Sequence, residues 1–359
     1  MTRRAYAPGR VNLIGEHTDY NLGYALPIAL QVGTTVEYDP GPGDLVASSA
    51  DEPDVAMIPT DTVPGGVTGW GAYVAGCLWV LRDAGHPVGG GRVRVASDVP
   101  VGAGLSSSAA LECAALLALV PDVDDRHAVA RLAQRAENEY VGAPTGLLDQ
   151  LASLYGAPDT ALLIDFLTLD VRPVPVPSGD GVHVLIIDSR APHRHAAGEY
   201  RQRREACEAA AAELGADSLR AVGDVLGVDS WRRLSDDVVR RRARHILTEN
   251  VRVLEAADAL RGSDFEKLGA LMSDSHASMR DDFEITIPSI DRIASAAVDL
   301  GAYGARMTGG GFGGSVVAFA PAGATERIEA ELPGIIESLG HPRPTVRRVS
   351  AGRGAQRLI

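Results

Sequence analysis

A glycine- and serine-rich stretch between residues 102 and 110 constrains this chain more than any other part of it. The stretch reads Gly-Ala-Gly-Leu-Ser-Ser-Ser-Ala-Ala. Residues 93–100 before it predict a strand, and the almost wholly apolar residues 109–120 after it predict a buried helix. Glycines let backbone N–H groups turn inward, and a helix start offers free N–H donors with positive partial charge. We therefore predict a phosphate-binding loop with these candidate residues: Gly102, Gly104, Leu105, Ser106, Ser107 and Ser108.

The three serines of this loop can cap the helix and add hydroxyl donors. The alternative is a capped helix after a tight turn that binds no ligand. A Walker loop is excluded, because it needs Gly-Lys-Ser/Thr and the single lysine of the chain, Lys267, lies elsewhere. A nucleotide bound at this loop would have to be held without a Walker lysine.

The length and charge of the chain limit the partners it can have. Its 359 residues suit two domains, and a hydrophobic content of 45% can fill ordinary cores. A formal net charge of -13 argues against non-specific binding to nucleic acid or to an anionic membrane. The same charge is compatible with a local positive pocket for a small anion.

Cysteine usage and hydropathy indicate where the protein works. The three cysteines, at positions 77, 113 and 207, are scattered and predict neither a zinc site nor a disulfide framework. The N-terminus has no apolar core of signal-peptide length, and no apolar run is long enough to span a bilayer. We therefore expect a protein of the reducing cytoplasm.

Two further stretches are too polar or too rich in glycine to form a core. Residues 7–21 read Ala-Pro-Gly-Arg-Val-Asn-Leu-Ile-Gly-Glu-His-Thr-Asp-Tyr-Asn, in which the apolar residues between 11 and 14 predict a strand. Residues 308–315 read Thr-Gly-Gly-Gly-Phe-Gly-Gly-Ser and precede a predicted strand at 316–319. So many glycines indicate close approach to a ligand or to another backbone segment. A flexible loop without a ligand is the alternative.

Two carboxylates lie at positions where a charge needs an explanation. Residues 126–141 predict a helix, and Glu137 shares a stripe of it with small alanines, which leave room around an inward carboxylate. A solvated glutamate at the helix edge is the alternative. Residues 142–146 end that helix, and Asp149 lies at the start of the next one, where the helix dipole favours an ionised carboxylate. Asp149 is therefore either a capping acid or a catalytic group.

The remaining sequence predicts loops, further helices and a boundary between two domains. Glycine and proline mark residues 40–66 as loops, and residues 70–83 follow a helical pattern. The proline-rich residues 158–181 predict an edge strand and a connector, and we place the domain boundary there. After a buried-type strand at 182–188, helices are expected at 196–214, 245–260 and 264–272.

Three of these stretches, in this order and spacing, resemble the galactokinases, a family within the GHMP small-molecule kinases. Residues 9–21 resemble the galactokinase signature, residues 99–110 resemble the ATP loop of the superfamily, and residues 307–314 are the third match. The resemblance implies a two-domain α+β fold with its site in the cleft between the domains. Residues 1–178 would form an N-terminal sugar- and ATP-binding domain, like domain 2 of ribosomal protein S5. Residues 179–359 would form a ferredoxin-like C-terminal GHMP domain, and whether the last residues pack back on the first domain stays open.

The resemblance also implies a reaction, in which the anomeric hydroxyl of a sugar is phosphorylated with ATP as the donor and Mg²⁺ as the cofactor. Asp149 resembles the carboxylate that takes the proton, and Arg10 resembles the partner that keeps it ionised and stabilises the transferring phosphate. Ser108 and Glu137 resemble the ligands of Mg²⁺, which prefers hard oxygen donors. The implied sugar contacts are Glu16, His17, Asp19, Gly146 and Tyr200.

Galactose is the sugar that the signature favours, because Thr18 and Asn21 match it. One alternative is a non-catalytic sensor that binds sugar and ATP, but such relatives lack part of the Ser-Ala stretch, which is intact here over residues 106–110. The other alternative is a kinase for a related sugar, such as N-acetylgalactosamine or arabinose. We expect a monomer that acts on a small molecule, with no nucleic-acid or membrane partner.

Overall fold

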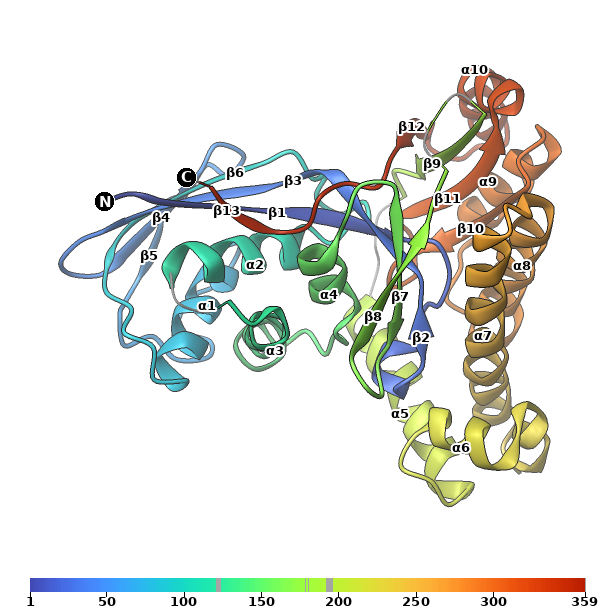
Figure 1. The fold of residues 1–359 in the computed structure, drawn as a ribbon, viewed down its shortest axis with the longest axis horizontal. Coiled ribbons are helices and arrows are strands. Elements are labelled where there is room, and N and C mark those ends of the chain that lie inside the picture. The colour runs from blue at the N-terminus through green and yellow to red at the C-terminus, as the bar shows by residue number, and fades with distance from the viewer. Residues whose placement is uncertain (121–123, 178, 180, 192–195, 359) are drawn as a thin grey trace.

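The computed structural model describes residues 1–120, 124–177, 179, 181–191 and 196–358. In this part of the chain, β-sheets and α-helices form two layered regions side by side (Figure 1). No helix of the described residues has the length and hydropathy needed to cross a bilayer.

The first region is a six-stranded sheet whose one face is covered by helices (Figure 1). Neighbouring strands are antiparallel except β4 and β6, which are parallel and joined through a helical connection. The strands, in sheet order, are β13 (Gln356–Leu358), β1 (Arg3–Asn12), β3 (Pro27–Pro40), β6 (Gly91–Ser97), β4 (Leu45–Ser49) and β5 (Ala56–Ile58). The covering helices are α1 (Gly71–Asp83), α2 (Ser107–Leu119), α3 (Arg126–Arg135) and α4 (Leu148–Tyr155).

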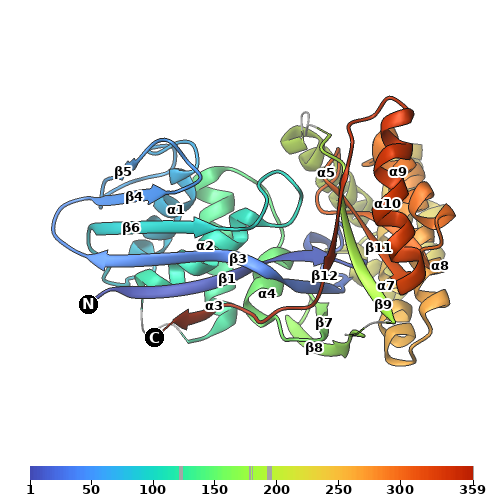
Figure 2. The same cartoon turned by 90° about the horizontal axis from the view of Figure 1, so that it is seen from above.

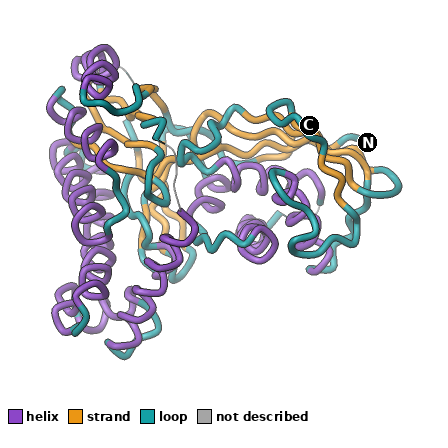
Figure 3. The backbone as a smooth tube through the Cα atoms, turned by 180° about the vertical axis from the view of Figure 1, so that it is seen from behind, coloured by secondary structure: helices purple, strands orange, loops and turns teal. Residues whose placement is uncertain are grey.

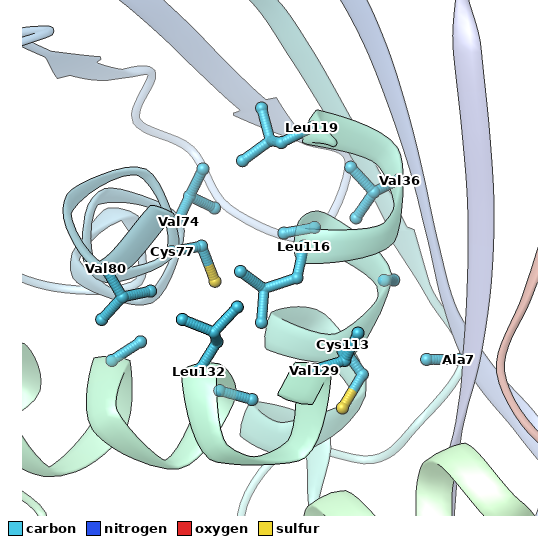
Figure 4. Packing of buried hydrophobic residues seen from close by; sticks show 14 of the residues in the cluster. Ala7, Val36, Val74, Cys77, Val80, Cys113, Leu116, Leu119, Val129 and Leu132 are labelled. Carbon is cyan, nitrogen blue, oxygen red and sulfur yellow. The ribbon is translucent and has the colours of Figure 1, made fainter. Parts of the chain in front are cut away.

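Small and branched apolar side chains fill the space between this sheet and its helices. Figure 4 shows Val36 of the sheet near Leu116 of α2, with Cys77 of α1 and Val129 and Leu132 of α3 in the same cluster. Because α2 is buried on nearly all sides, as its apolar sequence predicts, it is rigidly held. The glycine- and serine-rich loop at its start is therefore attached to a fixed element.

The second region is a four-stranded antiparallel sheet with helices on its outer side (Figures 2 and 3). Its strands, in sheet order, are β10 (Gly304–Thr308), β11 (Ser315–Pro321), β9 (Val182–Asp188) and β12 (Thr345–Val349). Its helices are α5 (Ala196–Glu213), α6 (Leu219–Leu226), α7 (Asp237–Arg261), α8 (Phe265–Ser278), α9 (Pro288–Asp299) and α10 (Ala322–Ser338).

Strand β9 is apolar on both faces because both are buried, as its sequence predicts. Leu185 and Ile187 share a core with residues of α9 and α10. Val184 and Ile186 point the other way and share a core with residues of the first region, among them Leu30. This shared core fixes the two regions against each other.

A three-stranded sheet and the C-terminal segment add to the junction between the regions. The small sheet consists of β2 (Tyr24–Ala25), β7 (Thr160–Asp165) and β8 (Asp170–Pro175). After β12 the chain returns to the first region, where the Gly352 N–H donates to the Ala29 carbonyl at 2.8 Å and β13 pairs with β1. The last residues therefore do pack back on the first domain, which the sequence left open.

One sequence-based expectation about local structure is wrong, and one predicted helix is present with a change of helix type. Residues 40–66, predicted as loops, contain the short strands β4 and β5, whose few apolar residues complete the sheet edge. The helix predicted over 126–141 changes at Ala136 from α-helical to π-helical, and this π-helical segment (Ala136–Val141) carries Glu137. Such bulges often lie at functional sites. The domain boundary predicted at 178/179 stays a prediction, because residues 178 and 180 lie outside the described part of the chain.

Candidate active site

A cavity lined by several charged and polar side chains opens where the two regions meet. Its walls come from the end of β1 and the loop after it, the start of α4, the start of α5 and the loop before β11. The sequence-predicted residues that line it are Arg10, Glu16, His17, Asp19, Gly146, Asp149 and Tyr200. The structure thus gathers into one cavity side chains that are up to 190 positions apart.

Arg10 and Asp149 form an ion pair at one wall of this cavity. Arg10 Nε and Nη2 lie 2.8 and 2.6 Å from Asp149 Oδ1, and Arg10 Nη1 donates to the Gly104 carbonyl at 2.7 Å. A shift in register between Pro8 and Arg10 bulges β1 here, and bulges re-aim side chains. Arg10 is therefore tied both to the carboxylate and to the glycine loop.

Ser106 does not cap α2, although the sequence suggested that it could. It lies at the N-cap position of the helix but makes no side-chain capping bond. Its backbone is left-handed, with φ 59°, and its hydroxyl instead donates to Asp149 Oδ2. Asp149, in the first turn of α4, is thus held from both sides, by Arg10 on one oxygen and by Ser106 on the other.

The residues predicted to contact a sugar line the same cavity as this pair. His17 packs against Tyr200, with ring centroids 4.8 Å apart, and its Nδ1 lies 2.9 Å from the Tyr20 hydroxyl. Asp19 Oδ1 accepts from the Tyr20 N–H at 2.9 Å, and Asp19 Oδ2 accepts from the Leu148 N–H at 3.5 Å. A sugar presents hydroxyls and apolar C–H groups. Hydrogen-bond acceptors can bind the hydroxyls, and aromatic rings can pack against the C–H groups.

Burial sets the protonation of these groups. Desolvation, helped by repulsion from nearby His245, lowers the pKa of His17 to about 3, so its imidazole is neutral at neutral pH. Desolvation, followed by repulsion from Asp149, raises the pKa of Asp19 to about 6. Burial also raises the pKa of the Tyr200 hydroxyl well above its usual value. A neutral imidazole and a neutral phenol can each donate and accept a hydrogen bond.

The Asp19 carboxylate occupies the space that a side chain on Gly146 would fill. The effect of adding a methyl group at position 146 can therefore be predicted. A Cβ on Gly146 would lie 1.8 Å from Asp19 Oδ2. Because Asp19 can rotate away, Gly146→Ala is expected to leave the fold intact and to raise the KM for the sugar at least about tenfold, the usual cost of losing a hydrogen bond to a charged group. Gly334→Ala in α10 is the control, since a Cβ there meets nothing within 4 Å. An unchanged sugar KM in Gly146→Ala would show that Asp19 does not contact the sugar.

A second cavity, of about 640 Å³, lies on the other side of the start of α2. Ser107 and Ser108 line it together with Trp70 and Tyr73, and β6 contributes Val95. Aromatic rings beside a helix N-terminus are suited to a flat base and a chain of phosphates. Because Ser106 contacts Asp149 while the next two serines line this second cavity, the two cavities meet at the start of α2.

Backbone contacts fix the glycine loop between the two cavities. The Leu105 carbonyl accepts from the Arg10 N–H at 3.1 Å, and a Cβ on Gly9 would lie 2.6 Å from the same oxygen. A Cβ on Gly309 would lie 3.2 Å from the Gly104 carbonyl, so the second glycine cluster packs on this loop. The predicted close approach to another backbone segment is therefore present. Gly102 has a left-handed φ of 78°, which favours glycine.

Glu137 is buried, as its place on the helix stripe suggested, and it points toward the start of α2. Its Oε2 accepts from Thr145 Oγ1 at 2.9 Å and from Gln150 Nε2 at 3.0 Å. Desolvation and the nearby Asp149 raise its pKa to about 6, and a hydrogen bond with Ser108 opposes this shift. No group of three or more His, Cys, Asp or Glu in the described residues forms a metal site. Ser108 and Glu137 supply two hard oxygen donors beside the second cavity.

Three residues of this site were not identified from the sequence. Asn12 lines the sugar-side cavity and donates to Glu16 Oε2 at 2.6 Å. Arg306, fully buried in β10, binds the same oxygen. Glu112, one turn after Ser108 in α2, is fully buried beside the Gln150 side chain, whose hydrogen bond only partly offsets the effect of burial on its pKa. A charge inside an otherwise apolar run is the signal that would have found Arg306 and Glu112.

Family models match three segments of the chain. Residues 3–40 match the galactokinase galactose-binding signature, residues 72–157 match the GHMP kinases N terminal domain, and residues 256–334 match GHMP kinases C terminal. The galactose-binding signature covers the loop that carries Glu16, His17 and Asp19, and the N-terminal model covers the glycine loop, Glu137 and Asp149.

Whole-chain similarity agrees with these segments. A galactokinase of Mycobacterium bovis is 55% identical over 360 residues, covering 99% of both chains. A galactokinase of Streptomyces coelicolor is 42% identical, covering 98% of this chain and 93% of its own. A Lactococcus lactis galactokinase structure complexed with galactose superposes with a TM-score of 0.91 at 30% identity, covering 99% and 95%. A mevalonate kinase structure shares the fold, with a TM-score of 0.67 at 17% identity. The predicted α+β fold is thereby confirmed.

Proposed function

Because the chain belongs to the galactokinase family, within the GHMP kinases, we propose that it transfers the γ-phosphoryl group of ATP to the anomeric hydroxyl of galactose. One observation carries this proposal: a cavity lined by sugar-type contacts and a cavity suited to a nucleotide meet at the start of α2, and Asp149 lies at that point. Galactose 1-phosphate and ADP are the products.

Asp149 and Arg10 are the proposed catalytic residues. Asp149 accepts the proton of the anomeric hydroxyl, whose oxygen forms a bond to the γ-phosphorus while the bond from that phosphorus to the leaving oxygen of ADP breaks. Arg10, fixed by Asp149 and the Gly104 carbonyl, orients the carboxylate and places positive charge beside the transferring group. Since the Ser106 hydroxyl binds the second oxygen of Asp149, the carboxylate is oriented before the substrate arrives.

The sugar contacts follow from the same cavity. Glu16 and Asp19 present acceptors for hydroxyls, while His17, whose ring nitrogens face Tyr20 and the Gly310 carbonyl, and Tyr200 form an aromatic wall of the cavity. Gly146 lines the cavity through its backbone and leaves room for the Asp19 carboxylate. The glycine loop (Gly102, Gly104, Leu105) with Ser106, Ser107 and Ser108 holds the phosphates of ATP through backbone N–H groups and hydroxyls.

Mg²⁺ fits the donor set at the second cavity. Ser108 and Glu137 would hold it, because both present hard oxygen atoms and substrate phosphates supply the remaining ligands that Mg²⁺ prefers. When bound, Mg²⁺ neutralises charge on the phosphates during transfer. Thr145 and Gln150 hold the Glu137 carboxylate in place.

Glu137→Gln is expected to raise the Mg²⁺ concentration for half-maximal rate about 10- to 100-fold, the range seen when the groups around a metal are altered. The KM for galactose should change little, since Glu137 does not line the sugar-side cavity. The measurement is initial rate against free Mg²⁺ at saturating galactose. Glu139→Gln, an exposed neighbour in the same π-helical segment, is the control. An unchanged Mg²⁺ dependence in Glu137→Gln would remove this residue from the metal site.

A coupled assay of ADP release with ATP, Mg²⁺ and a panel of sugars tests the proposed reaction. Galactose should give the highest kcat/KM, above N-acetylgalactosamine, arabinose and glucose. Galactose binding without ADP release from any sugar would instead indicate a sensor, and a higher kcat/KM for another sugar would reassign the substrate. The similarity to galactokinases over the whole chain favours the enzyme.

Four expectations from the sequence stay predictions. They are the domain boundary at 178/179, a monomeric state, a cytoplasmic location and the absence of nucleic-acid and membrane partners. Light scattering after size exclusion tests the second, and the expected mass is that of one 37.6 kDa chain.

A further inference from the structure

Arg306 is a fully buried cation that contacts the sugar-side cavity only through another residue. It lies in the middle of β10 with 0% of its surface exposed. Its Nη1 donates to Glu16 Oε2 at 2.6 Å and to the Leu13 carbonyl at 3.3 Å, and its Nε donates to Ser275 Oγ at 3.1 Å. A buried guanidinium is costly unless its donors are paired, so these contacts fix its position.

Glu16 has little acceptor capacity left once its protein partners are counted. An ionised carboxylate offers about four acceptor sites. Oε2 accepts from Asn12 Nδ2 and from Arg306 Nη1, both at 2.6 Å, and Oε1 accepts from the Gly309 N–H at 2.8 Å. One site therefore remains, on Oε1, while Glu16 lines the cavity with only 3% of its surface exposed.

The charges around Arg306 form a balanced cluster. Its Nη2 lies 3.6 Å from Glu249 Oε1, so it is shared by two buried carboxylates. Glu249 has a second cation, Arg252, whose Nε lies 2.7 Å from its other oxygen. Glu16 has no other ion-pair partner among the described residues. Burial raises the pKa of Glu16, and the charge of Arg306 opposes that shift.

We propose that Arg306 is a positioning residue for the sugar site: it fixes the Glu16 carboxylate so that a single acceptor, on Oε1, faces the substrate and selects one sugar hydroxyl. This inference rests on the proposed function, because it takes the sugar-side cavity to be the galactose site. Arg306 belongs to the second region and Glu16 to the first, so the second region would orient a substrate contact of the first region. Selection would come from the number of acceptors, since a hydroxyl displaced from that one site finds no other on Glu16.

Arg306→Lys tests the proposal because it keeps the charge and loses the planar pair of donors. We expect the KM for galactose to rise about 10- to 100-fold, with the KM for ATP within about threefold of the parent. Monodeoxy-galactoses give the specific readout: one of them, the analogue lacking the hydroxyl that Glu16 binds, is a poor substrate for the parent enzyme. The penalty for an analogue is the ratio of kcat/KM for galactose to kcat/KM for that analogue. In Arg306→Lys this ratio should fall toward one for the analogue that lacks the Glu16-bound hydroxyl, while the ratios for the other analogues stay as in the parent.

Arg252→Lys is the matched control. It alters the same cluster through Glu249, and Arg252 has no contact with Glu16 among the described residues, so its galactose KM and deoxy-sugar penalties should match the parent. If Arg306→Lys does not fold, Ser275→Ala removes the acceptor for Arg306 Nε, together with the hydrogen bond that Ser275 donates to Glu249, and should raise the galactose KM by a smaller factor.

Three outcomes separate the inference from the proposed function. A parent enzyme that does not phosphorylate galactose overturns the proposed function. An active parent whose Arg306→Lys and Ser275→Ala variants keep the galactose KM and every deoxy-sugar penalty overturns the positioning role. A loss of kcat and thermal stability in Arg306→Lys, with an unchanged galactose KM, likewise assigns Arg306 to stability and overturns the positioning role.

Discussion

Asp149→Asn is expected to lower kcat for galactose phosphorylation about a thousandfold, the middle of the range for loss of a positioned proton acceptor. Asparagine has the same shape but cannot take the anomeric proton. Such a loss corresponds to about 4 kcal/mol of transition-state stabilisation. Binding of ATP and galactose should persist, since the glycine loop and the other residues that line the sugar-side cavity are unchanged. Stopped coupled assays give kcat, and calorimetric titration gives the two dissociation constants.

Asp165→Asn is the control for this variant. Asp165 forms a largely buried pair with Arg220, at 3.3 Å, but does not line the cavity. It should keep kcat within about threefold of the parent, because its pair is structural. Near-normal turnover in Asp149→Asn would remove Asp149 from the catalytic role, and equal losses in both variants would indicate damage to the fold.

Glu112→Gln is expected to stabilise the protein, and increasingly so as the pH rises. Burial, and next the charge of Glu137, raise the pKa of Glu112 well above its usual value of 4.5. Between the unfolded and folded pKa values the folded protein therefore holds a proton that the unfolded chain has released, so the parent loses stability as pH rises. The loss reaches about 1.4 kcal/mol for each pH unit in that window. Because glutamine does not titrate, the Glu112→Gln variant does not lose this stability as the pH rises.

Urea unfolding at pH 5 and pH 8, without metal or nucleotide, measures this effect. The difference in free energy of unfolding between Glu112→Gln and the parent should be larger at pH 8 than at pH 5. Glu331→Gln, an exposed position in α10, serves as the control and should show no comparable change. A difference that is the same at both pH values would mean that Glu112 has a partner that keeps it ionised.

Local sequence patterns predicted an element correctly where a single cause, such as burial of both strand faces, determines which residue types it contains. The strand at 182–188 is apolar over residues 184–187 because both of its faces are buried there, and its predicted bounds match β9. The short strands β4 and β5 were missed because glycine and proline surround them, and they become strands by pairing at a sheet edge. The return of β13 to β1 is a long-range pairing that no local pattern encodes.

For the site, the sequence predicted which residues meet but not how they are arranged. The clustered glycines and Glu137 stood out because each lies where its residue type is unfavourable without a partner or ligand, and Asp149 stood out because it lies at a helix start, where the dipole favours an ionised carboxylate. The Ser106 hydroxyl was expected at the helix cap and instead binds Asp149, a choice that depends on a side chain 43 positions away. Arg306 was missed for the same reason, since its partner Glu16 is 290 positions away in the sequence.

A crystal structure with galactose, Mg²⁺ and a non-hydrolysable ATP analogue would test the central claim most directly. We predict the anomeric oxygen within about 2.6–3.2 Å of the Asp149 carboxylate and directed at the γ-phosphorus, with the triphosphate on the start of α2 and the sugar between Asp149 and Asp19. A sugar whose anomeric oxygen points away from Asp149, or a nucleotide bound away from Ser106, Ser107 and Ser108, would contradict the account.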